Sequence, residues 1–146
     1  MATFSRNVTV NWEGSIMEGK GTAKAGSGAF NLPVSFPRRI GDAEGVTSPE
    51  EFMAAAHAAC YAMALNATVG RKGGQIARTD ISATVTADKG DAGITITTSK
   101  LSVTAHGLTG IPKEQFADVA REAESKCPVS NAYRGSMKIE LDAKAV

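Results

Sequence analysis

Alternating apolar and polar side chains predict that the chain begins with strands. Over residues 4–12 apolar side chains recur at every second position, the period of a half-buried strand, and Arg6 interrupts them as expected for an edge. Glycine and serine turns separate two weaker segments of this kind, near residues 16–23 and 29–34. We therefore expect an antiparallel meander in the N-terminal region, residues 1–47.

A long helix is predicted after an irregular loop over residues 35–47, which is rich in proline and glycine. The segment Ser-Pro-Glu-Glu at 48–51 has the features of a helix start, with Ser48 as N-cap, proline in the first turn, and Glu51 completing a capping box. The helix is expected to span residues 48–70. Because its residues are apolar on all sides, and mostly alanine, we expect it to be central and buried all round.

The region 75–146 predicts a second hairpin. Apolar residues alternate with polar ones over 81–88 and again from 94 onward, on either side of a Lys-Gly-Asp-Ala-Gly turn. Further along the second strand the apolar residues move from one set of alternate positions to the other, which predicts a bulge near Ser99 and Lys100.

A second helix is expected from Pro112, with its apolar face continuing to an inward-facing Cys127. Pro128 is expected to end that helix and open a short one, whose free N–H groups would lie near the Cys127 sulfur. A last strand follows over 137–141. The order of strands, long helix, strands, helix and strand predicts one α+β domain over residues 1–146.

Composition narrows the class of protein. The net charge is +1 and no basic cluster appears, so we expect neither nucleic acid nor a membrane as partner. The first residues lack the pattern of a secretory signal, and we expect a cytoplasmic protein. His57 and Cys60 interrupt the long apolar stretch and glutamates stand at its entrance, which argues against a membrane span.

The two cysteines, Cys60 and Cys127, leave three interpretations open: burial, metal binding or redox chemistry. No paired cysteine or histidine spacing predicts a metal site, and no cofactor motif is present. A reactive thiol is held as thiolate by a nearby cation. Glu50 lies ten residues before Cys60, about 15 Å along a helix, so only a folded-back loop or a second subunit brings the two together.

The sequence resembles the OsmC/Ohr family, the osmotically inducible and organic hydroperoxide resistance proteins, and is closer to the OsmC branch. Residues 44–60, Glu-Gly-Val-Thr-Ser-Pro-Glu-Glu-Phe-Met-Ala-Ala-Ala-His-Ala-Ala-Cys, are similar to its central-helix signature, and Cys-Pro-Val-Ser at 127–130 to its second cysteine motif. The likeness extends over the whole chain in element order, including Trp-Glu-Gly at 12–14 and Asp-Ala-Gly at 91–93.

The resemblance implies an OsmC-like fold, with antiparallel sheets wrapped around the buried central helix of an intertwined homodimer. It implies a thiol-dependent peroxidase without cofactor or metal, which reduces organic hydroperoxides and, more weakly, hydrogen peroxide. A dithiol, of the lipoyl type or another small dithiol, is the implied reductant. Cys60 matches the peroxidatic cysteine and Cys127 the resolving one. Glu50 matches the glutamate after the proline, and we match its arginine partner to Arg39 rather than to the adjacent Arg38.

The expected substrate-binding residues are Arg39 and the apolar side chains Phe36, Phe52 and Met53. Two other functions stay open at this point. One is a non-catalytic, stress-related ligand-binding α+β module whose cysteines are structural. The other is a hydrolase in which Cys60 pairs with His57.

Overall fold

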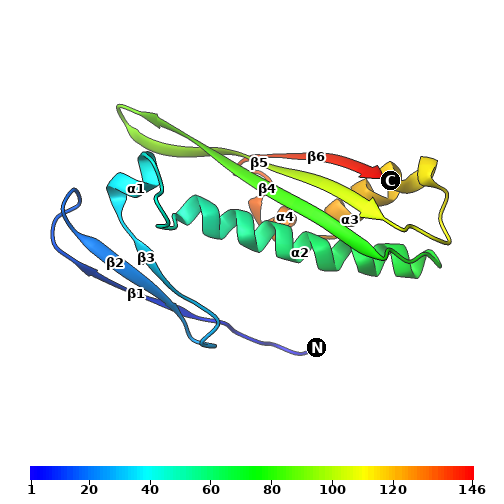
Figure 1. Cartoon of the computed structure of the whole chain (residues 1–146), viewed down its shortest axis with the longest axis horizontal. Coiled ribbons are helices and arrows are strands. Elements are labelled where there is room, and N and C mark those ends of the chain that lie inside the picture. Colours follow the sequence, from blue (N-terminus) through cyan, green and yellow to red (C-terminus); the bar gives the residue numbers. More distant parts are fainter. The chain divides into compact units, whose positions relative to one another are not determined.

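The computed structural model describes all 146 residues, which form two compact units, Met1–Phe52 and Met53–Val146. Figure 1 shows the order of the elements, three strands, a short and a long helix, two long strands, three short helical segments and a final strand. This is the predicted α+β order. The long helix α2 (Pro49–Arg71) begins in the first unit and continues into the second.

The first unit contains the predicted antiparallel meander of β1 (Val8–Glu13), β2 (Lys20–Ala25) and β3 (Asn31–Val34), with β2 in the middle. The strand pairing begins where Val8 meets Ala25, the last residue of β2. The predicted first strand was therefore placed too early, because residues before Val8 have no strand opposite them.

The stretch predicted as an irregular loop contains a short helix, α1 (Phe36–Ile40). Pro37 stands in its first turn, where a missing N–H costs nothing and the fixed φ suits a helix. The Arg39 N–H donates to the Ser35 carbonyl at 3.1 Å and closes that turn. The loop prediction was wrong for these five residues because proline was taken as a breaker.

The start of α2 confirms Ser48 as its cap, since the Ser48 hydroxyl accepts a hydrogen bond from the Glu51 N–H at 3.1 Å. The other half of the predicted capping box is wrong. The Glu51 carboxylate instead accepts from the Thr47 hydroxyl at 2.7 Å. Thr47 is buried, so its hydroxyl needs a partner within the protein.

The second unit contains a sheet of β4 (Arg78–Gly90), β5 (Gly93–His106) and β6 (Lys138–Ala145), with β5 in the middle. The long hairpin β4–β5 is antiparallel, but β6 runs parallel to β5, so this sheet is mixed rather than wholly antiparallel. The helices between β5 and β6 supply the crossover that a parallel pair requires.

The hairpin is irregular at a different place from the one predicted. The register shifts between Thr86 and Ala87, so that Thr97 on β5 is the unpaired residue, two positions before Ser99. The change in the alternation of apolar residues showed that this strand is irregular, but it placed the irregularity too late in the strand. The reason is that the alternation changes only after the extra residue.

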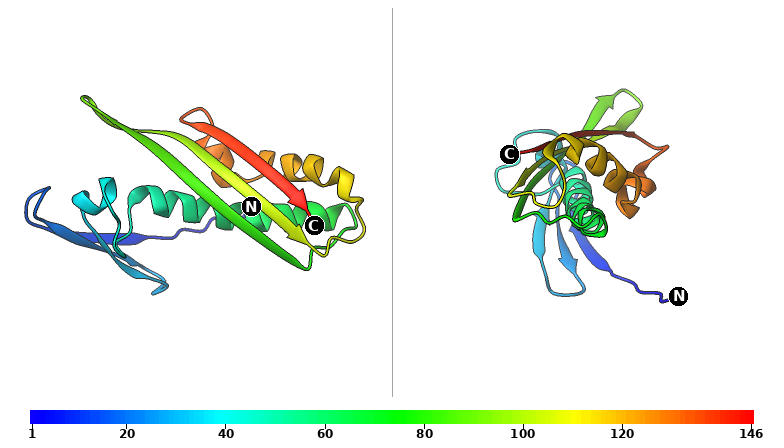
Figure 2. Two further views of the ribbon diagram at one scale, coloured as in Figure 1. Left: turned by 45° about the horizontal axis from the view of Figure 1, so that its top comes forward. Right: turned by 90° about the vertical axis from the view of Figure 1, so that its right-hand side faces the viewer.

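The core of the second unit lies between the sheet and two helices, α2 and α3 (Phe116–Ser125) (Figure 2). Tyr61 and Leu65 are fully buried on α2, and the Tyr61 hydroxyl donates to the Ala120 carbonyl of α3 at 3.0 Å. The remaining buried apolar residues of this core are Val69, Leu101, Val103, Ala105, Ile111, Phe116, Val119, Ala120, Ala123 and Cys127.

Two short segments flank α3. A single 3-10 turn, η1 (Lys113–Gln115), precedes it, and α4 (Pro128–Tyr133) follows with Cys127 at its N-cap position. The predicted break and restart at Cys127 and Pro128 are confirmed.

Within this chain α2 is buried on one side only, and the burial of its other side stays a prediction. His57, Tyr61, Leu65, Thr68 and Val69 are its buried residues. Figure 2 shows the strands of the second unit and α3 beside the helix.

By length and composition α2 would also be able to cross a membrane, a property that it shares with core helices of globular proteins. Its buried side forms part of a folded core.

Candidate active site

The two cysteines lie close together in the second unit, brought there by different elements. Cys60 stands near the middle of α2 and is half-buried, whereas Cys127 is fully buried at the start of α4. Neither is in a disulfide. Cys127 lies close enough to Cys60 to raise the pKa of its thiol. The sequence predicted both thiols as functional candidates, and the fold places them side by side.

Burial raises the pKa of the Cys60 thiol, since removal of water disfavours the thiolate. The backbone N–H of Val129 acts in the opposite direction by donating to the sulfur, and Cys127 raises the pKa further. No positively charged side chain is among these influences. These surroundings therefore favour the neutral thiol of Cys60 over its thiolate.

The free N–H groups of α4 were predicted to lie near the Cys127 sulfur. Cys127 makes no side-chain capping bond to its helix, and it is Cys60 that receives the Val129 N–H. The reason is geometric, because Cys127 belongs to the hydrophobic core of the second unit and its side chain packs there instead of turning back over the helix.

His57 lies one turn before Cys60 and is fully buried. Its Nδ1 is 2.6 Å from the Ser99 hydroxyl and its Nε2 is 2.7 Å from the Ser130 hydroxyl. Burial lowers the pKa of His57 and favours the neutral ring. Because both ring nitrogens already have partners, His57 is not free to take a proton from Cys60, and the hydrolase interpretation loses its base.

A groove of about 640 Å³ gives access to Cys60 from outside the second unit. Cys60 is at one end and Arg71 lies 11 residues further along α2, about 16 Å at helical rise. Lys126 also lines the groove, but its ammonium is paired with Glu122 at 2.5 Å. The other lining residues are Met63, Ala64, Ala67 and Pro128.

The first unit contains the predicted arginine–glutamate pair. Arg39 Nη2 donates to Glu50 Oε1 at 2.6 Å, and Arg39 Nε is 3.1 Å from both carboxylate oxygens. The Arg39 and Glu50 side chains are only 27% and 15% exposed. Arg38 instead pairs with Glu44, which is 62% exposed. Of the two adjacent arginines, Arg39 is thus the one held by Glu50.

The charge of this pair is stabilised from both sides. Hydrogen bonding to Arg39 lowers the pKa of Glu50, and hydrogen bonding to Glu50 raises the pKa of Arg39. A guanidinium held in this way by one carboxylate has a fixed orientation and keeps its remaining N–H donors for another acceptor.

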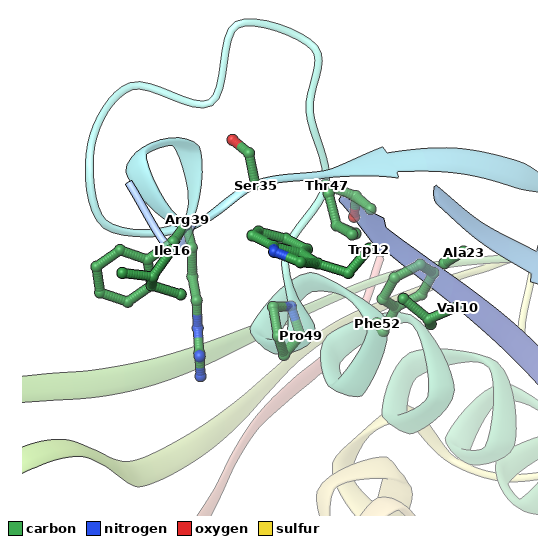
Figure 3. Close-up of a pocket in the computed structure, with 11 residues that line it drawn as sticks. Val10, Trp12, Ile16, Ala23, Ser35, Arg39, Thr47, Pro49 and Phe52 are labelled. Carbon is green, nitrogen blue, oxygen red and sulfur yellow. The ribbon is translucent and has the colours of Figure 1, made fainter. Parts of the chain in front are cut away.

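Arg39 also lines an apolar pocket of about 460 Å³ that lies wholly within the first unit (Figure 3). Phe36 and Phe52, predicted as substrate-binding residues, line it as well, but Met53 does not. In the view of Figure 3, Arg39 and Ile16 lie on one side, with Phe52 and Val10 on the other. The remaining lining residues are Trp12, Ala23, Val34, Ser35, Thr47 and Pro49.

Sequence reasoning missed several residues of these two sites. Trp12 was noticed only as part of a motif, and its contribution to the pocket depends on the pairing of β1 with β2. Ser130 was in the second cysteine motif without a role. Ser99 carried no signal, because only the folded sheet brings it to His57. No group of three or more histidine, cysteine or carboxylate side chains that would hold a metal is present.

The partly buried pair Arg39–Glu50 predicts a pH-dependent contribution to stability. Because the folded pKa of Glu50 lies below its ordinary value of 4.5, the pair stabilises the fold above that pH. This stability is lost as the pH falls through the folded pKa. Glu50→Gln is expected to lower the free energy of unfolding by about 1–2 kcal/mol at neutral pH, measured by urea unfolding.

The matched control is Glu44→Gln, which removes the exposed partner of Arg38 and is expected to cost less than about 0.5 kcal/mol. The difference between the two variants should shrink as the pH is lowered from about 5 to about 3. The prediction would be contradicted if both variants lowered the free energy of unfolding equally at neutral pH, or if the difference between them grew in acid. Either result would show that the Glu50 carboxylate has no special stabilising partner.

Comparison with known proteins gives the family. The family model described as OsmC-like protein matches residues 41–142. The chain is 35% identical over 144 residues to a protein named peroxiredoxin OsmC from Escherichia coli K12, with 98% of this chain and 99% of that protein covered. It is 29% identical to an organic hydroperoxide resistance protein of Xanthomonas axonopodis pv. citri, with 84% of each chain covered.

Solved structures confirm the fold. An organic hydroperoxide resistance protein OsmC from Legionella pneumophila superposes with a TM-score of 0.76 at 22% identity, covering 99% of both chains. The organic hydroperoxide resistance protein OhrB of Bacillus subtilis gives 0.73 at 24% identity, covering 94% of this chain and 98% of the other. With the family model matching most of its length and a relative at 35% identity along nearly all of it, the chain belongs to the OsmC-like family.

Proposed function

We propose that this protein is a cysteine-based peroxidase that reduces organic hydroperoxides and, more weakly, hydrogen peroxide. Relatives named peroxiredoxin and organic hydroperoxide resistance protein support a peroxidase-type, oxidoreductase role. The observation that carries the mechanism is the pairing of two free thiols, Cys60 and Cys127, beside an N–H donor from α4.

In the first step the Cys60 thiolate attacks the terminal oxygen of the hydroperoxide. The O–O bond breaks, and the alkoxide leaves and takes up a proton to become the alcohol. The peroxide is reduced by two electrons and the sulfur is oxidised to a sulfenic acid. In the second step the Cys127 sulfur attacks the Cys60 sulfur, and the hydroxyl group leaves as water with the proton of Cys127. A disulfide results.

Attack requires a thiolate, and the surroundings of Cys60 within the second unit favour the thiol. We assign the missing cation to Arg39, with Glu50 orienting its guanidinium. An adjacent guanidinium lowers a thiol pKa and donates to the peroxide oxygens. The fork with Glu50 supports this assignment, because it leaves N–H donors of Arg39 available.

The apolar pocket beside Arg39 supports an alkyl hydroperoxide as the preferred substrate. Its aromatic residues Trp12, Phe36 and Phe52 offer the surface that an alkyl or aryl group buries favourably. Met53, expected with them from the sequence, lies outside this pocket and contributes no surface to it. Hydrogen peroxide has no group for this pocket and should react more slowly.

The exposed side of α2 supports a homodimer, the assembly that the resemblance implies. Met63 is 74% exposed there. The other exposed side chains on this side are small and mostly apolar, so the backbone of another helix can approach closely. They are Ala55, Ala56, Ala59, Asn66, Ala67 and Gly70.

The disulfide must be reopened by a dithiol, for which a lipoyl-type or other small dithiol is our proposal. A cytoplasmic location fits this chemistry, since that compartment keeps thiols reduced between turnovers. The non-catalytic ligand-binding module is the alternative function, and thiol reactivity separates it from the peroxidase.

The first test is the loss of thiols on oxidation. One equivalent of cumene hydroperoxide should remove two titratable thiols per chain, because the sulfenic acid of Cys60 condenses with Cys127. Cys60→Ser should abolish peroxide consumption. Cys127→Ser should consume about one equivalent per site and then progress to sulfinic and sulfonic acid at Cys60, visible as added oxygens by mass spectrometry.

An unchanged thiol count in the unmodified protein would overturn the peroxidase and favour the ligand-binding module. If the two cysteines had the opposite roles, the two serine variants would give a different result. In that case Cys127→Ser would block the first turnover, and Cys60→Ser would accumulate oxidised Cys127.

The second test concerns the arginine. Arg39→Met should raise the Cys60 pKa, measured by the rate of alkylation against pH, because a cation beside a half-buried thiolate is removed. Glu50→Gln should raise it less. Arg38→Met is the matched control and should leave it unchanged; the reverse order of the two arginines would mean that Arg38 is the catalytic one.

The third test is the mass in solution. Light scattering at micromolar concentration should give about twice the chain mass of 15.1 kDa. Met63→Glu places a charge on the exposed side of α2 and should shift the protein towards the monomer. A monomeric unmodified protein would leave no second subunit to complete the site.

A further inference from the structure

His57 is hydrogen-bonded to Ser99 on one side and to Ser130 on the other. This Ser99–His57–Ser130 bridge connects three elements of the second unit close to the two thiols. His57 is on α2, Ser99 on β5 and Ser130 on α4, and all three side chains are fully buried. The two hydrogen bonds are short, at 2.6 and 2.7 Å. No step of the proposed peroxidase chemistry uses this bridge, so its position one turn from Cys60 needs an explanation.

A neutral imidazole suits this position better than most side chains. It has one N–H donor and one acceptor nitrogen on opposite sides of a rigid ring, and each serine hydroxyl can donate or accept. Both ring nitrogens are therefore satisfied by groups from two different elements. Loss of either partner would leave a buried polar atom without a hydrogen bond.

The Ser130 end of the bridge holds the segment that serves both thiols. Cys127 is the N-cap of α4, Val129 donates its N–H to the Cys60 sulfur, and Ser130 follows directly. These residues belong to a single helical turn, closed by the hydrogen bond from the Asn131 N–H to the Cys127 carbonyl at 3.0 Å. Fixing Ser130 therefore also fixes the Cys127 and Val129 backbones.

The far end of α4 has its own attachment to α2. The Tyr133 hydroxyl donates to the Met53 carbonyl at 2.9 Å, and the Tyr133 ring meets the His57 ring edge-on with centroids 5.3 Å apart. At the beginning of α4, the His57–Ser130 bond is the hydrogen bond to α2, while the Asn131 amide donates to the Ser125 carbonyl of α3 at 3.1 Å and Cys127 packs in the core.

We propose that His57 is a positioning residue for disulfide formation. Its hydrogen bond to Ser130 keeps the first turn of α4 against α2, so that Cys127 stays within reach of an oxidised Cys60. The inference rests on the proposed peroxidase function. The Ser99 half of the bridge orients the ring from β5 but does not touch α4, and therefore provides a matched control.

The experiment uses two pairs of variants in the full-length protein. Ser130→Ala removes the bond to α4, and Ser99→Ala removes the equally buried bond to β5. At position 57, asparagine places its amide near the place of Nδ1 and glutamine near that of Nε2. His57→Asn therefore breaks the α4 side and His57→Gln the β5 side.

Each variant is treated with cumene hydroperoxide, and the ratio of disulfide to sulfinic acid at Cys60 is measured by mass spectrometry. Variants broken on the α4 side should show a fall of about tenfold or more in this ratio, because resolution slows while overoxidation does not. Variants broken on the β5 side should change it less than about threefold. Both serine variants should lose thermal stability to a similar extent.

Alkylation of Cys60 against pH gives a readout that needs no peroxide. The α4-side variants should raise the Cys60 pKa relative to their β5-side partners, because the Val129 N–H is no longer held on the sulfur. This comparison also remains available between the His57 variants if a serine variant does not fold.

The same disulfide ratio for the α4-side and β5-side variants would overturn the inference, since a merely structural bridge affects both sides equally. Failure of the unmodified protein to lose two thiols is a different result, because it would remove the proposed peroxidase function itself.

Discussion

The structure depends on the burial of one side of α2. Tyr61 and Leu65 pack against the sheet and α3, and the whole core of the second unit is built on this contact. Each buried side chain of this size contributes about 1.5–3 kcal/mol, so the contact fixes the helix within its unit. Cys60, next to Tyr61, is therefore held at the edge of a rigid core. A thiol at such an edge is reachable from the groove without being fully solvated.

The same burial places polar groups where they must be satisfied internally. His57 precedes Tyr61 by one turn and lies in the same core, so its ring requires two partners. One partner comes from β5 and the other from α4. The second bond attaches the first turn of α4, which has Cys127 at its N-cap position, to this core. The position of the second thiol, Cys127, is thus linked to a hydrogen bond of His57, which lies four residues before Tyr61.

Most of the elements and the two candidate thiols could be predicted from the sequence, because hydrophobic period, proline positions and helix caps are local signals. Ser48 was identified as a cap in this way, and the break at Cys127 from the proline that follows it. Burial on one side of α2 could not be predicted, since its composition is apolar all round and gives no direction. Contacts between distant segments, such as that of Ser99 with His57, had no local signal.

The residues of the candidate site could likewise be predicted only as far as local sequence signals reach. The resemblance identified Arg39 and Glu50, and the structure pairs them across one unit, with Arg39 on α1 and Glu50 in the first turn of α2. The resemblance favoured Arg39 over Arg38, and the fold supplies the physical reason, since neighbouring residues on a short helix point in different directions and only Arg39 meets Glu50. The Val129 N–H was beyond sequence reasoning, because every residue but proline carries one.

The electrostatics of Cys60 explain why the proposed mechanism includes a cation besides the groups that surround the sulfur. Burial raises its pKa, and the Val129 N–H is the one influence in the second unit that lowers it. A hydrogen bond from a neutral donor contributes about 1 kcal/mol, which is less than the cost of burying an unpaired ion. One N–H therefore does not convert a half-buried thiol into a thiolate. A guanidinium does so more effectively, because it adds a full charge to its hydrogen bonds. In the proposed mechanism Arg39 supplies that charge, so the reactivity of Cys60 towards peroxide depends on a guanidinium in addition to the Val129 N–H.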